Sequence, residues 1–175
     1  MPILDVLKSR GVPSAFFWNT RTLFSDRPWK RLLKEGHLLG SHAHTHVNLT
    51  TMPYSLQKRQ LEVSFRELHK ITGRSPALFR PPFGKYNETT LKALHGLNMQ
   101  MILWNISSVD WELREDPQQI VRNVVNHLHP GGIILLHELP QTLHILPALL
   151  DKIMEAGYEC IIPDSENFIK PQEKK

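Results

Sequence analysis

Three histidines lie at alternate positions in one short stretch: His42, His44 and His46. Neutral imidazole is the commonest protein ligand for zinc-like metals. If the stretch is extended, alternate side chains share a face, and all three rings could bind one ion. If the chain turns after His44, His42 and His46 can still converge without it. The ordinary alternative is a polar strand end whose histidines are simply solvated.

Other side chains with chemical potential follow apolar segments elsewhere in the chain. Arg80 precedes a Pro-Pro-Phe-Gly turn, Asp110 follows a short apolar segment, and His137 ends the apolar run 133–136. An arginine can hold a carboxylate, and a carboxylate beside an imidazole favours the charged ring, as a general acid requires. The ordinary alternatives are a surface arginine, a loop-capping aspartate and a core histidine.

The segments between these residues alternate between short apolar strands and amphipathic helices. Strands are predicted over residues 14–19, 37–42, 77–80, 101–105, 133–136 and 159–163. Helices are predicted over residues 1–10, 27–35, 55–72, 88–97, 117–128 and 144–156. This order is typical of a parallel sheet with helices outside, in which the site lies at the carboxyl ends of the strands. The polar residues collect at those ends.

Taken together, these residues resemble the polysaccharide deacetylase family, also called the NodB homology domain or carbohydrate esterase family 4. Four of the five family motifs are recognisable, in the family's order and over nearly the whole chain. The resemblance implies an α/β fold, a distorted (β/α) barrel of seven parallel strands, with one catalytic domain over residues 1–175. It also implies a metal-dependent hydrolase that removes N-acetyl groups from a glycan such as chitin oligomers or peptidoglycan.

The second family motif is a histidine, a Ser or Thr, two variable residues and a histidine, and His42 and His46 match it. The resemblance implies that both bind a divalent metal, most simply zinc, with cobalt or another transition metal as alternatives. Ala43 stands where the family has the hydroxyl, so we expect a hydrogen bond that steadies the loop to be missing. His44 falls on a variable position, outside the ligand set, and remains an alternative ligand.

The third, fourth and fifth motifs assign the catalytic and substrate-binding residues. By resemblance, Arg80 pairs with the catalytic aspartate, Asp110 orients the catalytic histidine, and His137 protonates the leaving amine. The implied substrate-binding residues are Pro82, Phe83, Trp111 and Leu135. Within this set the resemblance places the Phe83 ring along the groove, the Trp111 ring at the wall of the acetyl pocket and Leu135 against the acetyl methyl.

The first family motif, Thr-Phe-Asp-Asp-Gly, has no counterpart in the chain. Its two aspartates are the general base and a metal ligand, whereas the only Asp before residue 26 is Asp5, inside a predicted helix. Residues 1–7 resemble the crossover that follows the missing first strand. We therefore expect an N-terminally incomplete chain, or else a catalytically impaired sugar- or metal-binding relic of the same fold. An open barrel edge would favour dimerisation or strand exchange.

Composition describes a globular protein with a mildly basic surface. The 175 residues are 41% hydrophobic and 22% charged, with a formal charge of +4, which leaves anionic cell-wall polymers as partners. We expect no nucleic-acid binding, because no run of Lys and Arg is interleaved with aromatics. Residues 170–175 are predicted to be a flexible basic tail. No membrane span or signal peptide is visible, although the family is often secreted or bound to the cell envelope.

Overall fold

The computed structural model describes residues 1–23 and 26–162. The chain divides into two compact units, which are described separately. Unit 1 comprises Met1–Val12 and Ile102–Cys160, and unit 2 comprises Pro13–Met101 with the described residues 161–162. The prediction of one domain over residues 1–175 stays a prediction, and the predicted tail over residues 170–175 lies outside the described residues.

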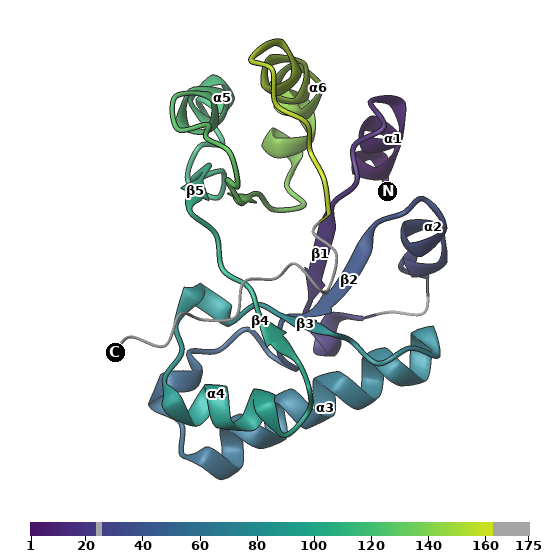
Figure 1. The fold of residues 1–175 in the computed structure, drawn as a ribbon, viewed down its shortest axis with the longest axis vertical. Helices are drawn as coiled ribbons and strands as arrows, with labels where there is room; N and C mark the ends of the chain where they lie inside the picture. The colour runs from purple at the N-terminus through teal and green to yellow at the C-terminus, as the bar shows by residue number, and fades with distance from the viewer. Residues whose placement is uncertain (24–25, 163–175) are drawn as a thin grey trace. The chain divides into compact units, whose positions relative to one another are not determined.

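Unit 2 is built around a parallel sheet whose strands follow one another in the order β1-β2-β3-β4 (Figure 1). The strands are β1 (Ala15–Trp18), β2 (Leu38–Ser41), β3 (Leu78–Phe79) and β4 (Gln100–Met101). The register sets Phe17 beside Gly40 and Ser41 beside Phe79. Glycine is needed at position 40, because a Cβ there would lie 2.6 Å from the Phe17 ring. The Ser41–Phe79 pairing holds the carboxyl end of β2 next to β3.

Helices complete unit 2 and bury its core. They are α2 (Trp29–Lys34), α3 (Tyr54–Thr72) and α4 (Glu88–His95). Helix α3 ends at Gly73, whose φ of 69° is the left-handed conformation that glycine adopts without strain. Leu61 of α3, Phe79 of β3 and Leu94 of α4 belong to one buried cluster. Ala43, from the histidine stretch, is also part of this core, so the stretch is anchored at its centre.

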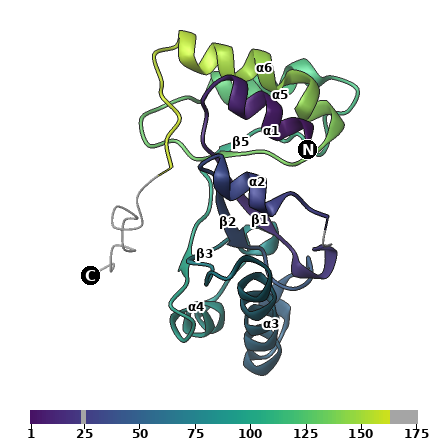
Figure 2. The same cartoon turned by 90° about the vertical axis from the view of Figure 1, so that its right-hand side faces the viewer.

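Unit 1 combines three helices with a pair of parallel strands. The helices are α1 (Pro2–Ser9), α5 (Pro117–Val125) and α6 (Pro140–Glu155), and the strands are β5 (Ile106–Ser107) and β6 (Ile134–Leu135). Helix α6 packs against both α5 and α1, as Figure 2 shows. Arg10, which follows α1, donates two hydrogen bonds to the Asp151 carboxylate on α6, at 3.0 and 3.1 Å. These contacts fix the helix that carries several polar residues of the site.

The predicted α/β class with parallel strands is confirmed. Every strand pairing in the described part of the chain is parallel, and helices alternate with the strands along the sequence except between β4 and β5. The two sheets are open, so residues 1–23 and 26–162 do not themselves close a barrel. None of the described helices is long and apolar enough to cross a membrane.

The predicted strand over residues 101–105 is wrong. The chain forms β4 at Gln100–Met101 and β5 at Ile106–Ser107, and residues 102–105 belong to neither. The side chain of Asn105 explains part of the break. Its Oδ1 accepts a hydrogen bond from the Ile133 N–H at 2.7 Å, while its own N–H donates to the Ile133 carbonyl at 3.1 Å. A side chain thus takes the place of a backbone partner just before β5 begins.

The two C-terminal elements also differ from prediction. Residues 159–162 form no strand, and residue 163 lies outside the described residues. A strand requires hydrogen bonds to a neighbour, and no described strand pairs with this segment. The last helix begins at Pro140 rather than at residue 144, because proline is well suited to the first helical position. The earlier start brings Gln141 and Thr142 into the first turn of α6.

Candidate active site

The histidine stretch leaves β2 and turns sharply at Ala43, which has a φ of 64° and is fully buried. His42 and His46 come together across this turn, with ring centres 5.0 Å apart. His44 is directed elsewhere, since its Nδ1 lies 3.0 Å from the Thr20 hydroxyl. The chain therefore turns instead of staying extended, and the histidine pair forms without His44.

Hydrogen bonds to helix α3 hold the turn, although Ala43 supplies no hydroxyl of its own. The Ala43 N–H donates to the Ser41 hydroxyl at 3.3 Å, and that hydroxyl lies 2.7 Å from the buried Ser64 hydroxyl on α3. The Thr45 N–H and hydroxyl both donate to Gln60 Oε1 at 3.0 Å. Neighbouring side chains thus steady the loop where the sequence led us to expect a missing bond.

The His42–His46 pair has the geometry of two metal ligands. His42 Nδ1 lies 2.6 Å from the Arg80 carbonyl oxygen; because a carbonyl only accepts, Nδ1 carries the proton and Nε2 carries the lone pair. Two imidazoles that share a tetrahedral zinc have ring centres roughly 5 Å apart, since each Zn–N bond is about 2.1 Å long. Among residues 1–23 and 26–162, no third His, Cys, Asp or Glu completes a set of three. The pair therefore fits a divalent metal as two of its ligands.

Arg80 joins the third motif to the second. The backbone N–H of Arg80 donates to the Ser41 carbonyl at 2.9 Å, and the backbone carbonyl of Arg80 accepts from the His42 ring. The guanidinium is buried 4.4 Å from the centre of the Phe17 ring. Burial lowers the pKa of Arg80 to about 10, so the side chain remains positively charged at neutral pH. Its pairing with a catalytic aspartate stays a prediction.

An exposed aromatic ring stands beside the histidine pair. Phe83 lies in the short 3-10 helix Pro82–Gly84, which follows β3, and its side chain is 57% exposed. The Phe83 ring meets the His46 ring edge to face, with centres 4.5 Å apart. Pro82 is buried beneath this turn, so of the two residues only Phe83 presents a surface that a ligand can contact.

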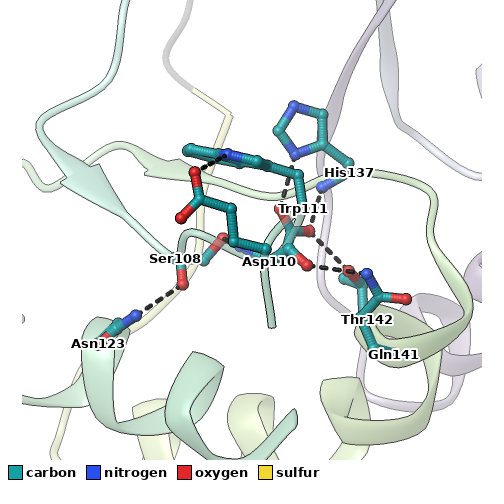
Figure 3. Close-up of polar contacts among 8 residues, drawn as sticks. Ser108, Asp110, Trp111, Asn123, His137, Gln141 and Thr142 are labelled. Atoms are coloured by element: carbon teal, nitrogen blue, oxygen red, sulfur yellow. Dashed lines mark hydrogen bonds and ion pairs between the residues drawn. The ribbon is translucent and has the colours of Figure 1, made fainter. Parts of the chain in front are cut away.

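In unit 1, Asp110 and His137 form a tightly bonded pair (Figure 3). Asp110 is completely buried, and its Oδ1 lies 2.6 Å from His137 Nδ1. Its Oδ2 accepts from the backbone N–H of His137 and from the Thr142 hydroxyl, each at 2.6 Å. The aspartate therefore holds the histidine by backbone and ring together, as residues that orient a catalytic imidazole do.

The two remaining predicted residues of unit 1 lie close to this pair. Trp111 is 47% exposed, and its ring meets the His137 ring edge to face with centres 5.4 Å apart. Leu135 is buried on β6, two residues before His137. Each pair of interacting polar residues, His42–His46 in unit 2 and Asp110–His137 in unit 1, thus has one exposed aromatic ring against it.

Asp110 is held in its ionised form. Burial works against the charge and raises the pKa of the carboxyl group. The hydrogen bonds from the His137 ring, the Thr142 hydroxyl and the His137 N–H together outweigh burial, and the pKa of Asp110 lies below its ordinary value. The pair is therefore built to keep a carboxylate beside the imidazole.

This carboxylate should make folding sensitive to acid. A pKa lower in the folded than in the unfolded chain stabilises the protein above the unfolded value, and the contribution is lost as pH falls through the folded value. We expect the free energy of unfolding in urea to fall below about pH 4, and to fall less steeply in Asp110→Asn. The matched control is Asp5→Asn, at an exposed position on α1. An acid dependence of Asp110→Asn that matches the wild type would contradict this assignment.

Backbone strain marks the same loops independently of any motif. Four non-glycine residues among those described have positive φ, and three of them are Ala43, Phe83 and Val109. Val109 directly precedes Asp110, and a β-branched residue at a φ of 56° is a genuine outlier. Such conformations cost on the order of 1–3 kcal/mol each and cluster at functional sites. Sequence reasoning missed them, since no residue at these positions signals a left-handed conformation.

Comparison with known proteins agrees with these features. Residues 1–102 match the polysaccharide deacetylase family model. The chain is 35% identical over 162 residues to the peptidoglycan-N-acetylmuramic acid deacetylase PdaA of Bacillus subtilis, covering 89% of this chain and 61% of that protein. It is 30% identical over 189 residues to a chitin deacetylase of Arthroderma benhamiae, covering 97% of this chain and 50% of that protein. The chain thus spans about half to three fifths of the length of these curated relatives.

A solved structure adds a relative of a different kind. A family 4 carbohydrate esterase pseudoenzyme from Bacillus anthracis superposes with a TM-score of 0.85 at 28% identity, covering 91% of this chain and 57% of that protein. A mutant of the same protein has restored enzymatic activity. Similarity in fold and sequence therefore extends to active and inactive proteins alike.

Proposed function

The chain belongs to the polysaccharide deacetylase family, and from that premise we propose that it supplies the metal-binding and proton-donating residues of a glycan N-deacetylase. The observation that carries the proposal is the buried Asp110 carboxylate, which is bonded to Nδ1 of His137 while the His137 side chain remains 43% exposed. An imidazole held in this way by a carboxylate is suited to transferring a proton at its outer nitrogen.

In the proposed reaction, His137 gives a proton to the amine as the acetyl carbon–nitrogen bond breaks. Asp110 keeps the ring oriented and stabilises its charged form. Trp111 stands edge-on to the His137 ring and supplies an apolar wall for the acetyl group, with Leu135 buried nearby in the same unit. In unit 2, Arg80 contributes a fixed positive charge and Phe83 an exposed ring against which a sugar can stack.

We propose that His42 and His46 hold a divalent metal, zinc or a similar transition metal such as cobalt. When bound, such an ion supplies Lewis-acid activation of an amide carbonyl and of water. The contribution of the chain is to fix the ligands: the Arg80 carbonyl sets the tautomer of His42, and the Ala43 turn sets the spacing of the two rings. Ordered partners of this kind raise the basicity of a ligand and fix its direction.

The proposed substrate is an N-acetylated glycan, in keeping with the names of the peptidoglycan and chitin deacetylases that the chain resembles. Exposed aromatic rings such as Phe83 and Trp111 offer the flat apolar faces that sugar rings contact. The formal charge of +4 suits an anionic polymer such as a cell-wall glycan.

A second candidate function is a non-catalytic sugar- or metal-binding protein of the same fold. Two observations favour it. Within the described ranges, only two residues of ligand type converge at the histidine pair, whereas catalytic zinc sites ordinarily have three protein ligands. In addition, one structural relative is a pseudoenzyme.

Acetate release separates the two functions. The full chain is incubated with zinc or cobalt and either acetylated chito-oligosaccharides or peptidoglycan, and free acetate is measured. Metal-dependent acetate release from either glycan supports the deacetylase. Binding of the glycan without acetate release supports the second candidate. If the chain neither binds a glycan nor releases acetate, the deacetylase and the sugar-binding protein are both contradicted.

A further inference from the structure

The first turn of helix α6 holds Asp110 at two points. The Thr142 hydroxyl lies 2.6 Å from Asp110 Oδ2, and the Gln141 side-chain amide donates to the Asp110 carbonyl at 2.8 Å (Figure 3). Thr142 is only 2% exposed, and Asp110 is completely buried. Because an ionised carboxylate can only accept, the Thr142 hydroxyl must be the donor. The bond is therefore directional and shielded from water.

Together with the backbone N–H of His137, this bond fixes which carboxylate oxygen meets the imidazole. Oδ2 of Asp110 already accepts from the Thr142 hydroxyl and from the His137 N–H, each at 2.6 Å. A carboxylate oxygen offers two in-plane lone pairs, and both are used. The His137 ring is left with Oδ1, which lies 2.6 Å from Nδ1. Rotation of the carboxylate would break all three bonds at once.

The orientation of the carboxylate sets the tautomer of His137. Because Oδ1 of Asp110 accepts a hydrogen bond, Nδ1 of His137 carries the proton. Nε2 is then the ring nitrogen that can take up and release a proton. Figure 3 shows the second ring nitrogen of His137 turned away from Asp110. The side chain is 43% exposed, so this nitrogen is open to a reacting group.

The Thr142 hydroxyl bonds to a residue outside its own helix. Leu139 is the residue that precedes α6, and its side chain makes no capping hydrogen bond. A threonine hydroxyl within a helix commonly bonds a carbonyl four residues back, as Thr72 does to Leu68 at 2.7 Å. Thr142 bonds instead to a carboxylate 32 positions away in sequence.

We propose that Thr142 is a positioning residue: its hydroxyl locks the Asp110 carboxylate in the orientation that keeps His137 in the Nδ1–H form. The inference rests on the proposed function in that His137 is the proton donor to the leaving amine. Thr142 touches no reacting atom and acts only through Asp110. Gln141 supports it by holding the main chain of Asp110 directly after the strained Val109.

The test combines ring nitrogen NMR with kinetics on the full chain. Thr142→Val keeps the shape and removes the hydroxyl, and Thr142→Ser restores the hydroxyl. The matched control is Thr90→Val, at another buried threonine whose hydroxyl donates at 2.6 Å, in this case to Gln57. We expect the His137 ring ¹⁵N shifts to report Nδ1–H in the wild type, Thr142→Ser and Thr90→Val, and a mixture of tautomers in Thr142→Val.

Kinetics should follow the tautomer. We expect kcat/KM to fall about 10- to 100-fold in Thr142→Val, the range seen when a hydrogen-bond partner that orients a functional side chain is lost. Most of the change should be in kcat, and activity should recover in Thr142→Ser. Unchanged ring shifts in folded Thr142→Val would overturn the proposal. If Thr142→Val does not fold, the ring ¹⁵N shifts of the wild type are the test, because a predominant Nε2–H form of His137 would also overturn the proposal. A wild type without acetate release would count against the proposed function, while the ring shifts would still test Thr142.

Discussion

Replacing His137 by glutamine is expected to lower the rate of acetate release by roughly 10²- to 10⁴-fold, the contribution typical of a positioned general acid or base. Glutamine keeps a polar group of similar length but cannot carry a proton to the leaving amine. The backbone bond from residue 137 to Asp110 is independent of the side chain and should persist. Bound metal should be unchanged, since His137 is not in the proposed ligand pair.

The matched control for His137→Gln is His127→Gln. His127 is an exposed histidine of the same unit whose Nδ1 bonds the Asn123 carbonyl at 2.8 Å, so it has a fixed ring next to a neutral acceptor. We expect this variant to retain full activity. Metal content by mass spectrometry and acetate release are measured on the same samples. If His137→Gln loses metal and activity together, His137 is a ligand or a folding residue, and its assignment as the acid is wrong.

The alternation of apolar strands and amphipathic helices was sufficient to predict the α/β class and most of the elements. It worked where a strand lies in a short apolar run that is followed by a polar residue, as β2 ends beside His42 and β6 shortly before His137. The break between β4 and β5 could not be predicted in this way. Residues 102–104 are as apolar as a strand, and only the Asn105 side-chain bond to Ile133 reveals the interruption.

Site residues with a distinctive type were predicted, and those with an ordinary type were not. Histidines at a fixed spacing and an aspartate before tryptophan carry a chemical signal in the sequence. Thr142, Ser41 and Gln60 do not, because their roles come from bonds across the fold to Asp110, Ser64 and Thr45. The one available signal for Thr142 was Pro140, whose preference for the first helical position indicates an earlier start of α6.

Replacing either His42 or His46 by alanine is expected to abolish stoichiometric binding of zinc or cobalt. Loss of a partner that merely orients a ligand costs about 10- to 100-fold in affinity, and loss of a direct ligand from a set this small should cost more. His44→Ala is the matched control, because it removes a ring from the same turn. The His44 ring bonds Thr20 and does not join the His42–His46 pair, so this variant should keep its metal.

Titration calorimetry with zinc and the visible absorption of bound cobalt measure the metal directly, without reference to activity. The cobalt spectrum also reports coordination, so a change of ligand in His44→Ala would be visible even at equal affinity. Circular dichroism separates loss of metal from loss of fold, which matters because His42 also donates to the Arg80 carbonyl. If His44→Ala releases the metal while His42→Ala retains it, the ligand pair is wrong, and the turn at Ala43 must open so that His44 reaches the ion.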